Sequence, residues 1–281
     1  MDQNNLQTAR QHLFYDRCEA LNIGVNRGLY WYHTIDLGND IITPGVFDFR
    51  RHLGAYCFPD RMQGQTVLDV GAANGFFSFE FIRRGALVTA TELPSLQELD
   101  RFPGQITTDL IYKAEKYSTA YTFQKPENLS TDLLYDLMLR EPFDFCSRVL
   151  GLYPDRKFVS ICNFSTQKLG RDFFDWVFLG DVLLHTIDPL KSLASAAKMC
   201  SGTLVIAQHL FETNDHQPIL LFTGGEDPKD DFSVWWKPNF EWFRQVLKKL
   251  GFRTVKIMGN FSDEFIPNGH SENKTIIHAK R

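Results

Sequence analysis

Residues 66–75 read TVLDVGAANG, and residues 76–85 continue with FFSFEFIRRG. The apolar run that contains an acidic residue near its end predicts a buried parallel strand. Gly71 and Gly75 bracket the turn that follows, where residues without a Cβ atom let the backbone pass close to a ligand. Apolar residues then recur at helical spacing, and two arginines precede Gly85, which predicts a helix that ends at this glycine.

A second strand is predicted over residues 87–91, and the acidic residue Glu92 follows it directly. At the ligand crevice of a doubly wound sheet, such a carboxylate can accept hydrogen bonds from both hydroxyls of a ribose. Dinucleotide-binding enzymes favour a Gly-x-Gly-x-x-Gly turn, in which a helix N-terminus binds the pyrophosphate. No glycine lies between Gly71 and Gly75, so the turn departs from that pattern. The alternative to a cofactor site is an ordinary strand, turn and helix whose glycines serve only the turn.

The turn from Asp69 to Gly75 resembles motif I of the class I S-adenosylmethionine-dependent methyltransferases, whose cofactor carries a sulfonium cation and no phosphate. The resemblance implies a doubly wound, Rossmann-like α/β sheet with strand order 3-2-1-4-5-7-6 and S-adenosylmethionine as the cofactor. It implies that the turn lies under the methionine part of the cofactor and that Glu92 binds the ribose. The residues assigned to the cofactor in this way are Asp69, Gly71, Ala72, Asn74, Gly75, Glu92, Leu93, Asn163, Phe164, Gly180 and Asp181.

Size, composition and charge agree with a single α/β domain over residues 1–281, with a hydrophobic fraction of 43%. The net charge of −4 gives no electrostatic footprint for a phosphate backbone, which disfavours nucleic acid as the partner. The 5 cysteines include no Cys-x-x-Cys pair and predict free thiols in a reducing compartment. The polar start and the short apolar runs predict neither a signal peptide nor a membrane span, so we expect a cytoplasmic protein.

Residues 1–60 are expected to form an N-terminal helix, from about residue 6 to 21, followed by an aromatic lid. Aromatic residues crowded beside glycine and proline indicate an ordered loop or a short hairpin. One interpretation is a hydrophobic plug on the core. The other is a wall of the substrate site that contains Trp31 and Tyr32, with His33 as a polar group inside it.

Residues 95–155 are too many for a plain crossover, which needs one short helix. Helices are predicted near residues 110–117, 129–140 and 143–150, and the last is taken as the crossover helix. The earlier part is interpreted as a helical insertion that forms either a cap or a dimer surface. A homodimer is therefore left open.

The remaining elements are predicted from short apolar runs and their punctuation. Strands are expected at residues 158–162, 175–179, 202–208, 252–258 and 274–279, and helices at 46–53, 189–199 and 239–250. In the fold that the resemblance implies, the residues after the third strand meet the adenine. Asn163 would then bond the base edge and Phe164 would lie on its face, and the alternative is a turn asparagine beside a core phenylalanine.

A narrower resemblance rests on GDVLLH at residues 180–185 and DPL at residues 188–190. These residues are similar to a signature of the tRNA wobble-uridine 5-oxyacetic acid enzymes and their small-molecule-modifying relatives. The stretch from Pro238 to Phe252 is similar to the closing helix of the same group. The tRNA enzymes have a tyrosine where this chain has Leu184, and that tyrosine helps to hold a carboxylated cofactor. Since leucine cannot donate a hydrogen bond, ordinary methyl transfer to a small molecule is favoured over carboxymethyl transfer to tRNA.

Two histidines are candidates for acid–base catalysis. His185 lies just beyond the fourth predicted strand, at the ligand end of the sheet, and histidine titrates near neutral pH. His33 is the second candidate, and the alternative for His185 is a structural histidine bonded to a loop carbonyl. Trp235 and Trp236 are predicted, with Trp31 and Tyr32, to wall the acceptor pocket. A core tryptophan pair is the competing interpretation, because adjacent residues rarely face the same side.

The sequence therefore predicts a methyltransferase that acts on an oxygen or nitrogen atom of a small molecule. The alternatives are a tRNA-modifying enzyme, a non-catalytic cofactor-binding protein and an NAD-dependent oxidoreductase. The turn at residues 71–75 departs from the glycine pattern that the last class favours. No metal site is expected, because no spacing of ligand residues predicts a closed tetrahedral set.

Overall fold

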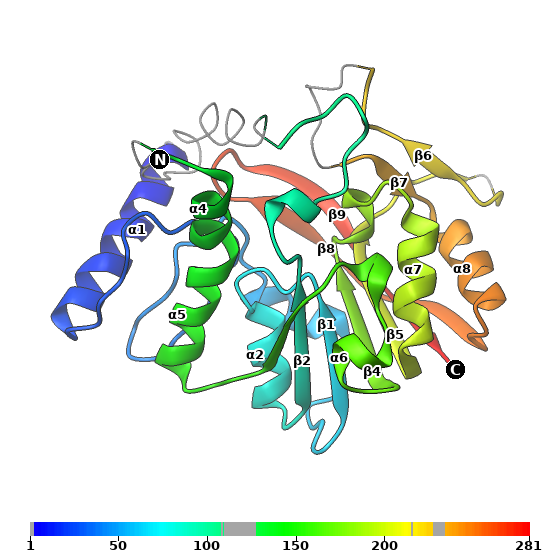
Figure 1. Cartoon of the computed structure of the whole chain (residues 1–281), viewed down its shortest axis with the longest axis horizontal. Helices are drawn as coiled ribbons and strands as arrows, with labels where there is room; N and C mark the ends of the chain where they lie inside the picture. The colour runs from blue at the N-terminus through cyan, green and yellow to red at the C-terminus, as the bar shows by residue number, and fades with distance from the viewer. Residues whose placement is uncertain (1–2, 108, 110–127, 215, 227–233) are drawn as a thin grey trace.

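The computed structural model describes residues 3–107, 109, 128–214, 216–226 and 234–281. Its centre is a sheet of 7 strands in the order β3-β2-β1-β4-β5-β9-β8 (Figure 1). The strands are β1 (Thr66–Val70), β2 (Leu87–Glu92), β3 (Asp155–Phe158), β4 (Phe174–Gly180), β5 (Cys200–His209), β8 (Thr254–Phe265) and β9 (His270–Lys280). The first five are parallel to one another, and β9 is antiparallel to both of its neighbours. The predicted strand order is confirmed.

Helices pack on both faces of this sheet. They are α1 (Gln3–Ala20), α2 (Phe76–Arg83), α4 (Thr131–Tyr135), α5 (Glu141–Leu150), α6 (Thr166–Leu169), α7 (Pro189–Lys198) and α8 (Phe240–Lys249). Short 3₁₀ or π turns are η1 (Arg50–Tyr56), η2 (Leu96–Glu98), η3 (Asp136–Arg140), η4 (Ile161–Asn163) and η5 (Leu183–His185). A separate two-stranded sheet pairs β6 (Leu220–Phe222) with β7 (Trp236–Pro238).

The alternation of side chains along β1 separates two hydrophobic cores. Val67 belongs to the core that α1, α2 and α5 cover, whereas its neighbour Leu68 belongs to the core under α7 and α8. Both side chains are fully buried, because helices cover the sheet on both faces. Figure 1 shows α1, α4 and α5 grouped beyond β2, and α7 and α8 grouped beside β5.

The helices α7 and α8 begin at polar caps that the sequence contains. The Asp188 side chain accepts a hydrogen bond from the backbone N–H of Lys191 at 2.9 Å. Asn239 accepts one from the backbone N–H of Trp242 at 2.9 Å. Each cap satisfies an N–H group that the first turn of a helix leaves without a partner. The helices predicted at residues 189–199 and 239–250 are therefore confirmed to within a residue or two.

The third strand was predicted too late in the chain. It covers Asp155–Phe158, and the polypeptide continues into one 3₁₀ turn at Ile161–Asn163. The strand lies at the sheet edge, where polar side chains are tolerated, so its sequence DRKF carries no apolar run. The apolar residues Val159 and Ile161 are buried beyond the strand end instead.

The helix expected at residues 46–53 is also wrong, because backbone pairing holds its first half extended. The N–H groups of Val46 and Phe47 donate to the carbonyls of Trp31 and Tyr32, each at 3.0 Å. A 3₁₀ turn begins only at Arg50. The predicted helices at residues 129–140 and 143–150 are α4, η3 and α5, which follow one another directly, and the helix predicted at 110–117 lies outside the described residues.

The N-terminal segment that contains the predicted lid is held by buried polar groups. Asn74, which is fully buried, accepts hydrogen bonds from the backbone N–H groups of Tyr32 and His33. Its amide donates to the carbonyl of Met138 at 3.0 Å. A Cβ atom at Gly45 would lie 2.0 Å from the carbonyl carbon of His33, so only glycine fits where the two stretches meet.

In the part of the chain that the structure describes, no helix combines the length and the apolar character that crossing a membrane demands.

Candidate active site

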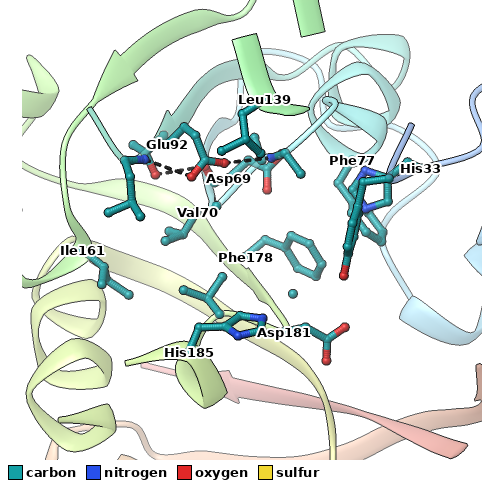
Figure 2. A pocket seen from close by; sticks show the side chains of 18 of the residues that line it. His33, Asp69, Val70, Phe77, Glu92, Leu139, Ile161, Phe178, Asp181 and His185 are labelled. Atoms are coloured by element: carbon teal, nitrogen blue, oxygen red, sulfur yellow. Dashed lines mark hydrogen bonds between the residues drawn. The ribbon is translucent and has the colours of Figure 1, made fainter. Parts of the chain in front are cut away.

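A cavity of about 440 Å³ opens at the carboxyl ends of β1, β2 and β4 (Figure 2). This is the point where the strand order reverses between β1 and β4, and ligands of open α/β sheets bind at such switch points. The predicted site residues that line the cavity are Tyr32, His33, Asp69, Gly71, Ala72, Glu92, Leu93, Gly180, Asp181 and His185.

The two glycines of the motif have different tasks. Gly71 has φ +67°, and a Cβ atom there would lie 2.9 Å from Cγ2 of Val182, across the cavity wall. Gly75 has φ +89° and does not line the cavity; a Cβ atom there would lie 2.6 Å from the ring of Phe79. Gly71 therefore keeps the turn open beside the cavity, whereas Gly75 lets the helix begin close to its own turn.

Glu92 presents its carboxylate at the tip of β2. One oxygen accepts a hydrogen bond from the backbone N–H of Ala73 at 3.1 Å, and the other accepts from the N–H of Leu93 at 2.9 Å. Burial raises the pKa of Glu92, and these two backbone N–H groups oppose that shift. Since a carboxylate has about four acceptor positions, each oxygen retains capacity for one more donor. Figure 2 shows both bonds at the cavity wall.

Asp69 lies beneath the glycine turn and is 1% exposed. Its Oδ2 accepts a hydrogen bond from the hydroxyl of Ser78, in the first turn of α2, at 2.5 Å. The pKa of Asp69 is raised to about 7, because burial and, to a smaller extent, the charge of Glu92 raise it by more than the bonds from Ser78 lower it. The bond ties β1 to α2 and so fixes the turn between them.

This shift predicts how stability depends on pH. The folded pKa of about 7 exceeds the ordinary value of 3.8, so between these pH values the folded state binds more protons than the unfolded state. The contribution of Asp69 to the free energy of unfolding therefore falls as the pH rises from about 4 to about 7. Asp69→Asn keeps an oxygen for Ser78 but has no proton to lose. We expect its free energy of unfolding to fall by about 2–4 kcal/mol less than that of the wild type over this pH range. Urea unfolding at several pH values measures it, with the exposed Asp60→Asn as the control. Parallel curves for wild type and Asp69→Asn would contradict the assignment.

A buried ion cluster closes the other side of the cavity. The ammonium of Lys274, a residue that is 1% exposed, contacts a carboxylate oxygen of Asp181 and one of Asp263, the latter at 2.6 Å. It also lies 4.4 Å from the centre of the Phe49 ring, within the range of a cation–π contact. Burial lowers the pKa of Lys274, but the two carboxylates outweigh it and raise the pKa above its usual value. Sequence reasoning missed both Lys274 and Asp263.

His33 is a neutral group in the cavity wall. It is 6% exposed, and its Nδ1 has no hydrogen-bond partner among the described residues. Burial and the charge of Lys274 lower the pKa of His33 to about 3, against a smaller opposing effect of Asp263. At neutral pH the imidazole is uncharged and is a weak base, so a hydrogen-bonding role suits it better than proton abstraction.

The two adjacent tryptophans hold the loop that carries His185, rather than lining the cavity. The N–H of Trp235 donates to the carbonyl of Leu184 at 3.0 Å, and the indole N–H of Trp236 donates to the carbonyl of Thr186 at 2.9 Å. These bonds fix the residues on both sides of His185, which is half-buried and lines the cavity. The prediction that Trp235 and Trp236 wall the acceptor pocket is therefore corrected.

Four other predicted residues lie outside the cavity lining. Trp31 packs in the core, with ring centroids 5.1 Å from Phe14, because its side chain points toward α1. Asn74 uses its polar atoms on the N-terminal segment and η3. Asn163 is exposed and Phe164 packs against the α7 core, because the third strand ends early; Ser160 and Ile161 line the cavity in their place.

Within the described ranges, no group of 3 or more histidine, cysteine, aspartate or glutamate side chains is arranged to hold a metal ion.

No family model matches the sequence. The ribosomal RNA small subunit methyltransferase A of Novosphingobium aromaticivorans is 36% identical over 85 residues, which cover 28% of this chain and 31% of that protein. The match thus spans less than a third of that relative's length.

Solved structures resemble most or all of the chain at low sequence identity. The N-terminal domain of EvdMO1, solved with SAH (S-adenosylhomocysteine) bound, is 13% identical and has a TM-score of 0.50, with 100% of this chain and 97% of that chain covered. The 1,6-didemethyltoxoflavin-N1-methyltransferase of Burkholderia thailandensis is 14% identical over 83% of this chain and 74% of that chain, with a TM-score of 0.44. The likeness to the EvdMO1 domain shows a shared fold.

Proposed function

We propose that the chain binds S-adenosylmethionine in this cavity and transfers its methyl group to a small-molecule acceptor. One observation carries the proposal. The open turn at Gly71 and the carboxylate of Glu92 border the same cavity at the switch point of the sheet. A glycine turn that served only the fold would not need an acid with spare acceptor capacity beside it.

The residues of the cavity fit the parts of this cofactor. The free acceptor positions of Glu92 suit the two ribose hydroxyls. The backbone of Gly71 and Ala72 would lie along the methionine part, and a Cβ atom at Gly71 would crowd the side chain of Val182, which also lines the cavity. Ser160 and Ile161 line the cavity on the adenine side, in place of the two residues predicted there.

The charges of the cavity favour a cation over a phosphate. Glu92 and Asp181 line it, and the ammonium of Lys274 is already paired with two carboxylates. A pyrophosphate would face these carboxylates, whereas a sulfonium is attracted to them. The same argument disfavours the NAD-dependent alternative, whose phosphates need a glycine-rich helix N-terminus.

When bound, the cofactor supplies an electrophilic methyl group on a positively charged sulfur. The protein's own contribution is then to position the acceptor and to exclude water. Leu93, Phe77 and Phe178 give the cavity apolar walls. His185 lines the cavity on a loop that two hydrogen bonds hold, so we assign to its imidazole the removal of a proton from the acceptor.

The proposal is tested with S-adenosylmethionine labelled on the methyl group. The protein is incubated with a small-molecule extract freed of RNA and protein and, separately, with purified RNA. We expect label in the small-molecule fraction, and we expect His185→Gln to lose transfer by about tenfold or more while it binds SAH as the wild type does. Label found only in RNA, or in neither fraction, would contradict the proposal. If neither fraction is labelled and SAH still binds, the protein binds the cofactor without catalysing transfer.

A further inference from the structure

The cavity has an end away from Glu92, Ser160 and Ile161, which are proposed to border the nucleoside part of the cofactor. Glu92 and Ile161 lie at one side of the view in Figure 2, and His33 and Phe77 lie at the other. The residues that line this second end are His33, Phe49, Tyr56, Phe77, Phe178, Asp181 and Lys274. It therefore combines aromatic walls with four side chains that carry polar groups, those of His33, Tyr56, Asp181 and Lys274.

The two carboxylate oxygens of Asp181 differ in their hydrogen-bond partners. Oδ2 contacts the ammonium of Lys274, while Oδ1 is buried without a hydrogen-bond partner among the described residues. The Asp181 side chain is 17% exposed and lines the cavity, so its carboxylate borders the space that a ligand would occupy. A desolvated carboxylate oxygen without a donor is unfavourable, and a ligand that donates a hydrogen bond removes that penalty.

Charged residues that pack against Asp181 fix the position of its carboxylate. Lys274 is held between Asp181 and Asp263, and the imidazole of His209 lies 3.6 Å from Asp263. Burial lowers the pKa of His209, but its bond to Asp263 and the negative charges of Asp181 and Asp263 together outweigh burial and raise the pKa. When His209 is neutral, the cluster contains two negatively charged carboxylates and one positively charged ammonium. It therefore presents no net positive charge to the cavity.

His33 supplies a second unused polar atom at the same end. The residue is more than nine-tenths buried, and its Nδ1 has no hydrogen-bond partner in the described part of the chain. The rings of Phe49 and Phe77 lie 5.6 Å and 6.1 Å from the imidazole. Aromatic rings and polar atoms therefore border the same end of the cavity.

We propose that this end is the acceptor subsite, and that the acceptor is a small ring-bearing molecule whose hydroxyl or amine group donates a hydrogen bond to Asp181. Anionic acceptors are excluded, because a carboxylate or phosphate would face the carboxylate of Asp181. The aromatic walls favour a planar ring over a flexible polar chain. The inference rests on the proposed function, since it names the substrate class of the same site.

The experiment measures probe binding by calorimetry in the presence of saturating SAH. The probes are catechol, which has two hydroxyl donors, 1,2-dimethoxybenzene, which has none, and benzoate, which is an anion. We expect catechol to bind at least about tenfold more tightly than either of the others. Equal affinities, or a preference for benzoate, would overturn the inference.

Two isosteric variants separate a direct contact from a general effect of charge. Asp181 has φ +51°, a conformation that asparagine also tolerates, so Asp181→Asn keeps the backbone. We expect this variant to bind catechol about tenfold more weakly and SAH within about threefold of wild type. Asp263→Asn, which contacts the same lysine but does not line the cavity, should lose much less catechol affinity.

The outcomes distinguish this inference from the proposed function. Failure of catechol to bind a wild-type protein that binds SAH overturns the acceptor subsite and leaves the cofactor site intact. Equal losses of catechol affinity in Asp181→Asn and Asp263→Asn also overturn it. Failure of the wild type to bind SAH overturns the proposed function and, with it, the inference that rests on it.

Discussion

Replacing Glu92 by alanine is expected to weaken SAH binding by about ten- to a hundredfold. The carboxylate would bond two ribose hydroxyls, and hydrogen bonds to a charged acceptor are about twice as strong as neutral ones. The substitution also frees the backbone N–H groups of Ala73 and Leu93, which both donate to this carboxylate. Calorimetric titration of wild type and variant with SAH measures the loss.

Glu98→Ala is the matched control, because Glu98 is an exposed acid that lines the same cavity from η2. We expect the control to bind SAH within about twofold of wild type, since an exposed charge contributes little. The assignment of Glu92 fails if its alanine variant binds as tightly as wild type, or if both variants lose affinity equally.

Replacing Gly71 by alanine is expected to bring SAH binding below detection while the protein still folds. The backbone has φ +67°, where an L-residue costs about 1–2 kcal/mol. The added methyl would lie 2.9 Å from Cγ2 of Val182, in the space beside the turn. Urea unfolding reports the strain, and calorimetry with SAH reports the blocked cavity.

Gly170→Ala separates strain from obstruction, because Gly170 has φ +74° and nothing lies within 4 Å of the position that a Cβ atom would take there. We expect it to lose a similar amount of stability, about 1–2 kcal/mol, and to bind SAH normally. Adding Val182→Ala to Gly71→Ala should relieve the contact and recover part of the stability. Normal SAH binding by Gly71→Ala would show that the turn does not face the cofactor.

The parts of the fold that were predictable are those that local patterns encode. The strand at 66–70, the glycine turn and the helix that follows are each specified by residues near in sequence, and all are present. Glu92 could be placed at the cavity because strand ends in a parallel sheet share one edge. The antiparallel pair β8 and β9 was expected, although it is longer than its apolar core suggested.

The parts that were missed depend on contacts between distant segments. Lys274 lies 93 residues from Asp181 along the chain, and only the pairing of β9 with β5 brings it to the cavity. The position of this lysine beside the apolar run TIIHA was the available signal. A lysine in a buried strand is rarely left unpaired, so it indicates an acidic partner nearby. Its partner Asp263 gave no such signal, because its strand was expected to end before it.

Aromatic residues were assigned wrongly where burial and function give the same pattern. Trp31 and Trp235 are 2% and 1% exposed, and both pack against other rings instead of facing the cavity. A dense aromatic sequence indicates burial, but it does not say which face of the segment turns toward a ligand. Tyr32 and His33, which adjoin Trp31, do line the cavity.

The most direct test of the central claim is calorimetric titration of the wild-type protein with SAH and, separately, with NAD⁺. The open turn at Gly71 and the carboxylate of Glu92 predict micromolar binding of SAH, and the acidic lining predicts none of NAD⁺, whose pyrophosphate would face carboxylates. Binding of NAD⁺ in place of SAH, or no binding of SAH by the folded protein, would contradict the account.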